Sequence, residues 1–158
     1  MMDGTWQVIV LAGATGDLGS RIAAALARRG AAVRALVRPQ TPSDKTAPLL
    51  AAGATPVEVD FADETALREA CVGADCVVSA LNGLEPIMID LQTRLLQAAV
   101  AAGVPRFMPS DFSLDFTKTR PGDNRNMDLR RDFMAAVDKA PIRVQSVLNG
   151  MFAELLSG

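Results

Sequence analysis

The chain has 158 residues, of which 49% are hydrophobic, and its formal net charge is −2. The length favours a single domain with a hydrophobic core, and the charge lacks the basic excess typical of a nucleic-acid-binding protein. No apolar run reaches the roughly 20 residues of a membrane span, and the first residues do not have the pattern of a signal peptide. Histidine and tyrosine are both absent, which excludes a Ser-His-Asp triad, a Cys-His pair, a His-ligated metal site and a tyrosine acid.

The first predicted strand, residues 6–12, leads through a glycine-rich turn into a predicted helix, residues 17–29. Glycine at the first position of such a turn permits a backbone conformation that a side chain forbids. Glycine at the second position lets backbone N–H groups approach a pyrophosphate, and glycine at the third lets helix and strand pack closely. Because a helix N-terminus also carries partial positive charge, we expect a dinucleotide site here, formed by Gly13, Thr15, Gly16, Asp17, Leu18 and Gly19.

Strands and helices continue to alternate along the rest of the chain. Short runs rich in Val, Ile or Leu predict strands at residues 33–38, 55–59, 76–81, 105–109 and 142–148. The segments between them predict helices at residues 44–52, 64–72, 87–102 and 126–139. Because the strands are apolar without alternation, both faces of the sheet should be buried. The prediction is an α/β fold with a doubly wound parallel sheet, strand order 3-2-1-4-5-6 and helices on both faces.

A polar segment, residues 110–125, interrupts the alternation after the fifth strand. It contains Pro121 and Gly122, and it follows the carboxyl end of a parallel strand. That position is the edge of the crevice in which such sheets bind ligands, so a functional loop is favoured over a disordered one.

The residue that ends the second strand selects the cofactor. Arg38 lies about 20 residues after the last motif glycine, where an NAD enzyme usually carries an acidic residue for the ribose 2′-hydroxyl. Arginine instead offers a planar fork of donors suited to a 2′-phosphate, and Lys45 is placed to add a second positive charge. The sequence therefore favours NADP(H) over NAD(H), the alternative being that Arg38 is a solvated charge at a strand end.

Five separate motifs stand in the order GATGDLG, LVRP, GADCVVSAL, AAVAAGVPRFMPSDF and LRRDF…APIRVQSVLNGMF. Together they resemble the NmrA-like and isoflavone-reductase-like group of atypical short-chain dehydrogenases/reductases. The resemblance covers nearly the whole chain. It implies a Rossmann fold and NADPH-dependent reduction of a small organic substrate.

The resemblance also implies cofactor contacts beyond the glycine-rich turn. Asp60 and Phe61, after the third strand, would bracket the adenine, the alternative being that Asp60 simply begins a turn. The small residues at the end of the fourth strand would let the cofactor come close. A Gln near the cofactor and PSEFG-like wording after the fifth strand are features of this group. These positions correspond to Ser79, Ala80, Leu81, Gln92 and Ser110.

The chain departs from the group in its candidate catalytic residues and in its length. Reductases of the group carry a lysine four residues before a paired Arg-Arg, and here that position is Asn126. Because Asn126 stands three residues before Leu129, we expect it on the inward face of its helix. Lys118, in the polar loop, is the substitute candidate. Members of the group also continue into a smaller substrate domain, so we expect residues 1–158 to be a cofactor-binding domain truncated before that domain.

Two functions follow for this chain and stay open. One is reduction of a small organic substrate by the full-length parent, and the other is a non-catalytic NADP(H) sensor that binds a protein partner. A nucleoside-sugar epimerase is disfavoured because that chemistry normally requires the absent tyrosine.

Two cysteines, Cys71 and Cys76, are expected to be reduced core residues, which favours the cytoplasm. A homodimer remains open.

Overall fold

A computed structural model describes residues 7–152 of the chain. Six parallel strands form one sheet in the order β3-β2-β1-β4-β5-β6, which confirms the predicted fold class and strand order. The strands are β1 Val8–Ala12, β2 Ala32–Val37, β3 Thr55–Glu58, β4 Cys76–Ser79, β5 Arg106–Met108 and β6 Arg143–Val144. The first residue of the predicted strand 6–12 and both ends of the predicted domain 1–158 lie outside the described residues.

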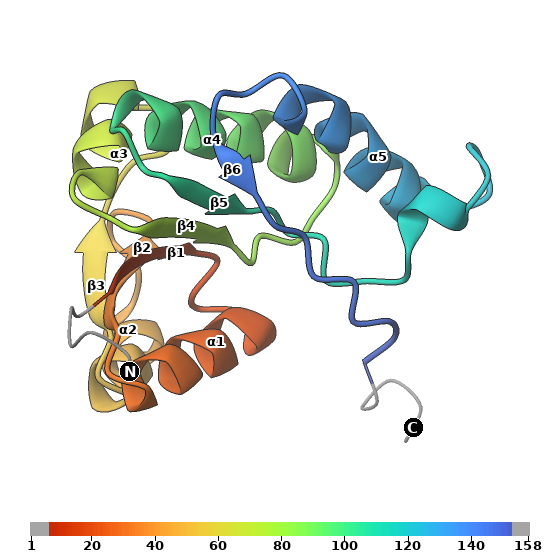
Figure 1. Ribbon diagram of the computed structural model, residues 1–158. Coiled ribbons are helices and arrows are strands. Elements are labelled where there is room, and N and C mark those ends of the chain that lie inside the picture. Colours follow the sequence, from red (N-terminus) through yellow and green to blue (C-terminus); the bar gives the residue numbers. More distant parts are fainter. Residues whose placement is uncertain (1–6, 153–158) are drawn as a thin grey trace, which may run out of the picture.

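The helices form two layers, one on each face of the sheet (Figure 1). Helices α1 and α2 cover one face, and helices α3, α4 and α5 cover the other. The α-helices are α1 Asp17–Arg28, α2 Ser43–Ala51, α3 Glu64–Cys71, α4 Gln92–Ala101 and α5 Arg125–Val137. Among residues 7–152, no helix is long and apolar enough to cross a membrane.

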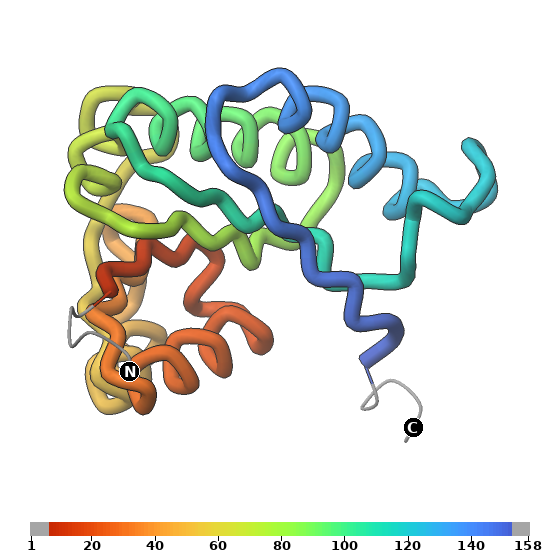
Figure 2. Tube along the Cα trace, viewed as in Figure 1, coloured from red at the N-terminus to blue at the C-terminus, as the bar shows by residue number. Residues whose placement is uncertain are grey.

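The path of the chain reverses direction between β1 and β4. Figure 2 shows the chain building outward from β1 to β3, returning to the other side of β1 for β4, and continuing to β6. In a doubly wound sheet this reversal opens a crevice at the carboxyl ends of the two central strands. The turn after β1 and the loop after β4 therefore lie where a ligand is expected.

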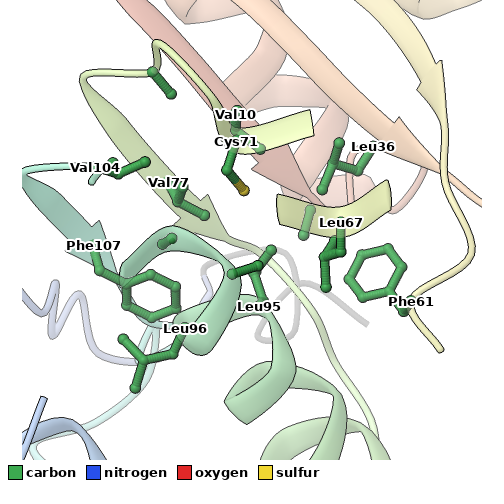
Figure 3. Packing of buried hydrophobic residues seen from close by; sticks show 14 of the residues in the cluster. Val10, Leu36, Phe61, Leu67, Cys71, Val77, Leu95, Leu96, Val104 and Phe107 are labelled. Atoms are coloured by element: carbon green, nitrogen blue, oxygen red, sulfur yellow. The ribbon is translucent and has the colours of Figure 1, made fainter. Parts of the chain in front are cut away.

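Alternate residues of β1 belong to the two halves of the core. Val10 and Ala12 pack with α3 and α4, whereas Ile9 and Leu11 pack toward α1 and α2. Figure 3 shows the first half, where Phe61 and Leu67 lie close to Leu95. This burial on both faces explains why β1 is apolar without alternation.

Both cysteines are free, as the sequence predicts. Cys71 is buried in the core beside α4, and Cys76 is half-buried at the start of β4. Burial raises the pKa of the Cys71 thiol to about 11, with Arg34 opposing the shift. Burial also raises the pKa of the Cys76 thiol. Raised thiol pKa values keep both groups protonated and poorly nucleophilic at neutral pH.

Most predicted elements differ from the structure by one or two residues at their ends, and two of them differ in kind or by several residues. The predicted helix 87–102 begins with a π-helix, η1 Pro86–Leu91, in which the Gln92 N–H donates to the Ile87 carbonyl five residues back. The predicted strand 142–148 contributes only β6, because the chain beyond Gln145 bonds to the polar loop instead of the sheet. There the Gly150 N–H donates to the Ser113 carbonyl at 2.9 Å.

Candidate functional site

The first and third glycines of the turn are required by the backbone. Gly13 has φ +79°, and a Cβ at this position would lie 2.5 Å from the Ala80 carbonyl oxygen. A Cβ at Gly19 would overlap the Gly13 carbonyl, so the start of α1 can approach β1 only without a side chain there. These are the roles predicted for the two glycines.

The second glycine meets a different constraint. A Cβ at Gly16 would have only the Gly13 carbonyl oxygen within 4 Å, at 3.4 Å, and the backbone there is extended, with φ −79° and ψ 170°. Neither packing nor backbone strain therefore requires glycine at this position. Because Gly16 has no side chain, the surface next to the start of α1 stays open.

The start of α1 presents backbone donors to that surface. Gly16 is the N-cap, and within residues 7–152 no side chain caps this helix. The first residues of an α-helix have N–H groups without a partner inside the helix, and here these residues are Asp17, Leu18 and Gly19. Such a helix start attracts an anion through its N–H groups and its dipole.

Two adjoining hollows lie at this edge of the sheet and share Gly16, Ala80, Leu81 and Asn82. The larger, with a volume of about 1140 Å³, is here called the large hollow, and the other, about 390 Å³, the small hollow. Nine of the predicted cofactor residues line the large hollow: Gly13, Thr15, Gly16, Arg38, Lys45, Asp60, Phe61, Ala80 and Leu81.

Cations gather along the large hollow. Arg38 follows β2 and Lys45 lies in the first turn of α2, and both are exposed. Among residues 7–152, neither side chain makes a hydrogen bond or an ion pair, so both can serve an anionic ligand. Arg94, on α4, lines the same hollow. Sequence reasoning missed Arg94 because nothing in the helical pattern separates it from a solvated arginine.

Asp60 and Phe61 also line the large hollow, after β3. The Ala62 N–H donates to Asp60 Oδ1 at 2.9 Å, so this carboxylate does begin a turn. Phe61 is buried, with 8% of its surface exposed, and belongs to the core beside Leu67. Asp60 therefore begins a turn and also lines the hollow. The two alternatives given for it, the start of a turn and a contact with the adenine, do not exclude each other.

The small hollow lies between the start of α1 and the loop after β5. The predicted residues Asp17, Leu18, Gly19 and Ser110 line it. Ser110 Oγ donates to the Leu81 carbonyl at 2.6 Å, which connects the loops after β4 and β5. Sequence reasoning did not find Arg21, Asn82, Phe112, Arg130 and Phe152, which also line it.

Gln92 and Ser79 are buried in the fold and line neither hollow. Gln92 Nε2 donates to the Met88 carbonyl at 3.0 Å, and the Ser110 N–H donates to Gln92 Oε1 at 2.7 Å. Gln92 therefore holds the backbone of Ser110 in place, although Gln92 itself does not line the site. Ser79 is fully buried at the end of β4, and within the described chain its Oγ has no hydrogen-bond partner.

The two candidate catalytic residues are both exposed. The prediction that Asn126 shares the inward face of its helix is wrong, because Asn126 is exposed. Helix α5 begins at Arg125, directly after the exposed residues 120–124, and this end of the helix extends beyond the sheet (Figure 1). Lys118 is 83% exposed and pairs with Asp115 at 3.3 Å. Neither side chain lines either hollow.

The paired arginines of α5 have separate roles. Arg131 donates to the carbonyls of Phe116 and Thr119, at 2.8 and 2.7 Å, and so fixes the polar loop to the helix. Arg130 lines the small hollow. Burial lowers the pKa of Arg130, while the nearby Asp111 opposes that shift. Burial raises the pKa of Asp111, whose Oδ2 accepts a hydrogen bond from Ser146 at 2.7 Å.

The sequence model of the NmrA-like family matches residues 5–127. The chain belongs to the NmrA-like family. It is 41% identical over 117 residues to the isoflavone reductase homolog IRL of Zea mays, a match covering 70% of this chain and 37% of the relative.

Solved structures of similar proteins support this membership. A structure described as AtPrR2 with NADP+ and (+)pinoresinol has a TM-score of 0.86 and 31% identity, covering 99% of this NmrA-like chain and 54% of that one. Leucoanthocyanidin reductase from Vitis vinifera, in a binary complex with NADPH, has a TM-score of 0.76 and 27% identity, covering 88% of this chain and 48% of that one. The chain thus spans about half the length of these proteins, and both are complexes with NADP+ or NADPH.

Proposed function

We propose that this chain binds NADPH and is the cofactor-binding part of a reductase that acts on a small organic substrate. The observation that carries the proposal is the open surface at Gly16, where an uncapped helix start meets two adjoining hollows. The complexes of similar proteins with NADP+ and NADPH support the choice of cofactor.

The residues of the two hollows suit the parts of this cofactor. The pyrophosphate would lie over the turn from Gly13 to Gly19, held by backbone N–H groups from Thr15 to Leu18. The adenosine end would fill the large hollow, with its 2′-phosphate between Arg38 and Lys45. The nicotinamide end would then lie toward the small hollow. Bound there, NADPH supplies two electrons and a hydrogen as hydride to an electron-poor carbon.

The protein's part in such a reaction is binding and orientation. The loops after β4 and β5 are joined by the Ser110–Leu81 hydrogen bond, which fixes two walls of the small hollow relative to each other. Holding the two reactants in a near-attack geometry removes a large entropic part of the barrier. Among residues 7–152, the small hollow is lined by no lysine, histidine or tyrosine, the side chains that most often donate a proton in such reductions.

A titration tests cofactor binding. NADPH and NADH are added separately to the protein, and bound cofactor is followed by nicotinamide fluorescence. We expect saturable binding of NADPH and much weaker binding of NADH. Equal affinities for both cofactors, or no binding of either, would contradict the proposal. Oxidation of NADPH against quinones, aldehydes and enones then tests the reductase part.

A non-catalytic NADP(H) sensor is the second candidate function. The observation in its favour is that Lys118 and Asn126 both lie outside the hollows. General acid catalysis contributes typically 10²–10⁴-fold to a rate, so its loss would leave binding with little turnover. Tight NADPH binding without oxidation of any compound in the panel would favour the sensor, and rapid turnover would exclude it.

A further inference from the structure

We propose that Arg130 binds the carbonyl oxygen of the substrate and stabilises the negative charge that forms on it during reduction. The inference rests on the proposed function and adds a residue and a substrate class to it. The substrate would be an organic carbonyl compound whose oxygen reaches the small hollow.

The position of Arg130 is the first support. Its side chain lines the small hollow together with Ser110 and Phe112. Leu81 and Phe152 also line the small hollow, so apolar surface is available for the carbon skeleton of a ligand. A few polar groups on mostly apolar walls are typical of small-molecule sites.

The hydrogen bonding of Arg130 is the second support. Its Nη1 donates to the Asn126 carbonyl at 3.0 Å, which holds the guanidinium against its own helix. Its Nε is buried and, among the described residues, has no hydrogen-bond partner. An arginine has five N–H donors, so donors remain for a ligand oxygen.

The charges around Arg130 are the third support. Asp111 is buried, with 3% of its surface exposed, and attracts Arg130 without forming an ion pair within 4 Å. The other arginine of the small hollow, Arg21, pairs with Asp17 at 3.1 Å. A cation in a partly desolvated site, not neutralised by direct pairing, is a strong donor to a developing oxyanion.

Two neighbouring cations, one on α5 and one in the polar loop, do not line the small hollow and are engaged elsewhere. Arg131 uses its guanidinium on Asp128, Thr119 and the Phe116 carbonyl. Lys118 is exposed and paired with Asp115. Arg130 is thus the cation that α5 presents to this hollow, one helical turn after Asn126.

The reaction balances with Arg130 staying protonated throughout. The carbonyl carbon gains the hydride that NADPH supplies, and the π electron pair of the C=O bond moves to the oxygen. NADPH is oxidised to NADP+, and the carbonyl compound is reduced. A proton from solvent then converts the alkoxide to the alcohol, because arginine does not release its proton in proteins. The guanidinium acts only by charge and hydrogen bonding.

Binding of 4-nitrophenol, whose phenolate stands in for the oxyanion, tests the inference without turnover. The probe is titrated at the pH of its half-ionisation in solution, with and without saturating NADP+, and the phenolate is followed by its visible absorbance. The native protein should bind the phenolate and increase its absorbance. Arg130→Gln should weaken binding at least roughly tenfold, as for loss of a charge-assisted hydrogen bond. Arg125→Gln, at an exposed arginine on the same helix, is the matched control and should bind as the native protein does.

A second pair of variants covers the case in which Arg130→Gln does not fold. Asp111→Asn keeps Arg130 and should bind the probe, whereas Asp111→Asn with Arg130→Gln removes both buried charges and should not. Equal phenolate binding by proteins with and without Arg130, or no binding by the native protein, overturns the inference. If NADPH does not bind but phenolate binding still depends on Arg130, the proposed function fails and the anion site stands.

Discussion

Replacing Gln92 with leucine tests whether the site depends on a buried hydrogen-bond bridge. Gln92 is 1% exposed and links α4 to the loop after β5 through the Ser110 N–H, with Oε1 at 2.7 Å from that nitrogen. Leucine has a similar volume, so the main loss is hydrogen bonding rather than packing. The Ser110 N–H would stay buried without an acceptor.

The magnitude follows from that unsatisfied donor. Leaving a buried donor unpaired costs about 1–3 kcal/mol, and the bond from Nε2 to the Met88 carbonyl is lost as well. The apolar leucine side chain offsets part of this loss. We expect the free energy of unfolding to fall by about 2 kcal/mol, since the two losses exceed the offset. For a domain of this size, that change lowers Tm by roughly 4–8 °C.

Urea denaturation followed by circular dichroism measures this change, provided that the slope of unfolding is unaffected. Gln97→Leu, at an exposed position of the same helix, is the control and should change stability little. NADPH affinity should also fall in Gln92→Leu, since Ser110 lines the small hollow. A Gln92→Leu protein within about 0.5 kcal/mol of the native protein, the range of ordinary surface substitutions, would refute the reasoning.

Three further predictions follow from the site. Gly16→Val should fold, because a Cβ at this position meets only the Gly13 oxygen, but it should no longer bind NADPH. Gly19→Val is the comparison, and it should fail to fold because a Cβ there overlaps the Gly13 carbonyl. Thermal melting and cofactor titration measure both, and normal NADPH binding by Gly16→Val would contradict the pyrophosphate site. Arg38→Ala should weaken NADPH binding by roughly 1.5–3 kcal/mol, the range for hydrogen bonds to charged groups, and leave NADH nearly unchanged; equal losses for both would count against a phosphate role. Burial raises the pKa of Asp111 above 3.8. The free energy of unfolding of the native protein should therefore fall as the pH rises from about 3.8 through the raised pKa, because Asp111 ionises less readily in the folded protein. Asp111→Asn should lack that loss in unfolding measurements across this range, and parallel curves would contradict it.

The fold class and the glycine-rich turn could be predicted from the amino-acid sequence, and the strand order was predicted from the fold class. The strand signal is local, because a run such as Val8–Ala12, apolar without alternation, is typical of a parallel sheet covered by helices on both faces. Gly13 and Gly19 are dictated by backbone geometry within a few residues of β1. Arg38 lines the same hollow as the turn, as the sequence predicts, because the carboxyl ends of neighbouring parallel strands meet at one edge of the sheet.

The surroundings of Gln92, Asn126 and Arg130 depend on long-range packing and could not be predicted from the sequence. Gln92 bonds to a residue 18 positions away, and no local pattern tells such a buried bridge from a surface glutamine. Asn126 has the spacing of an inward residue, but the first turn of α5 lies beside an exposed loop rather than over the sheet. Arg130 faces the small hollow because α5 packs there, and the sequence does not fix which side of a helix meets a distant loop. Periodicity reports which residues share a face, whereas long-range packing decides what that face contacts.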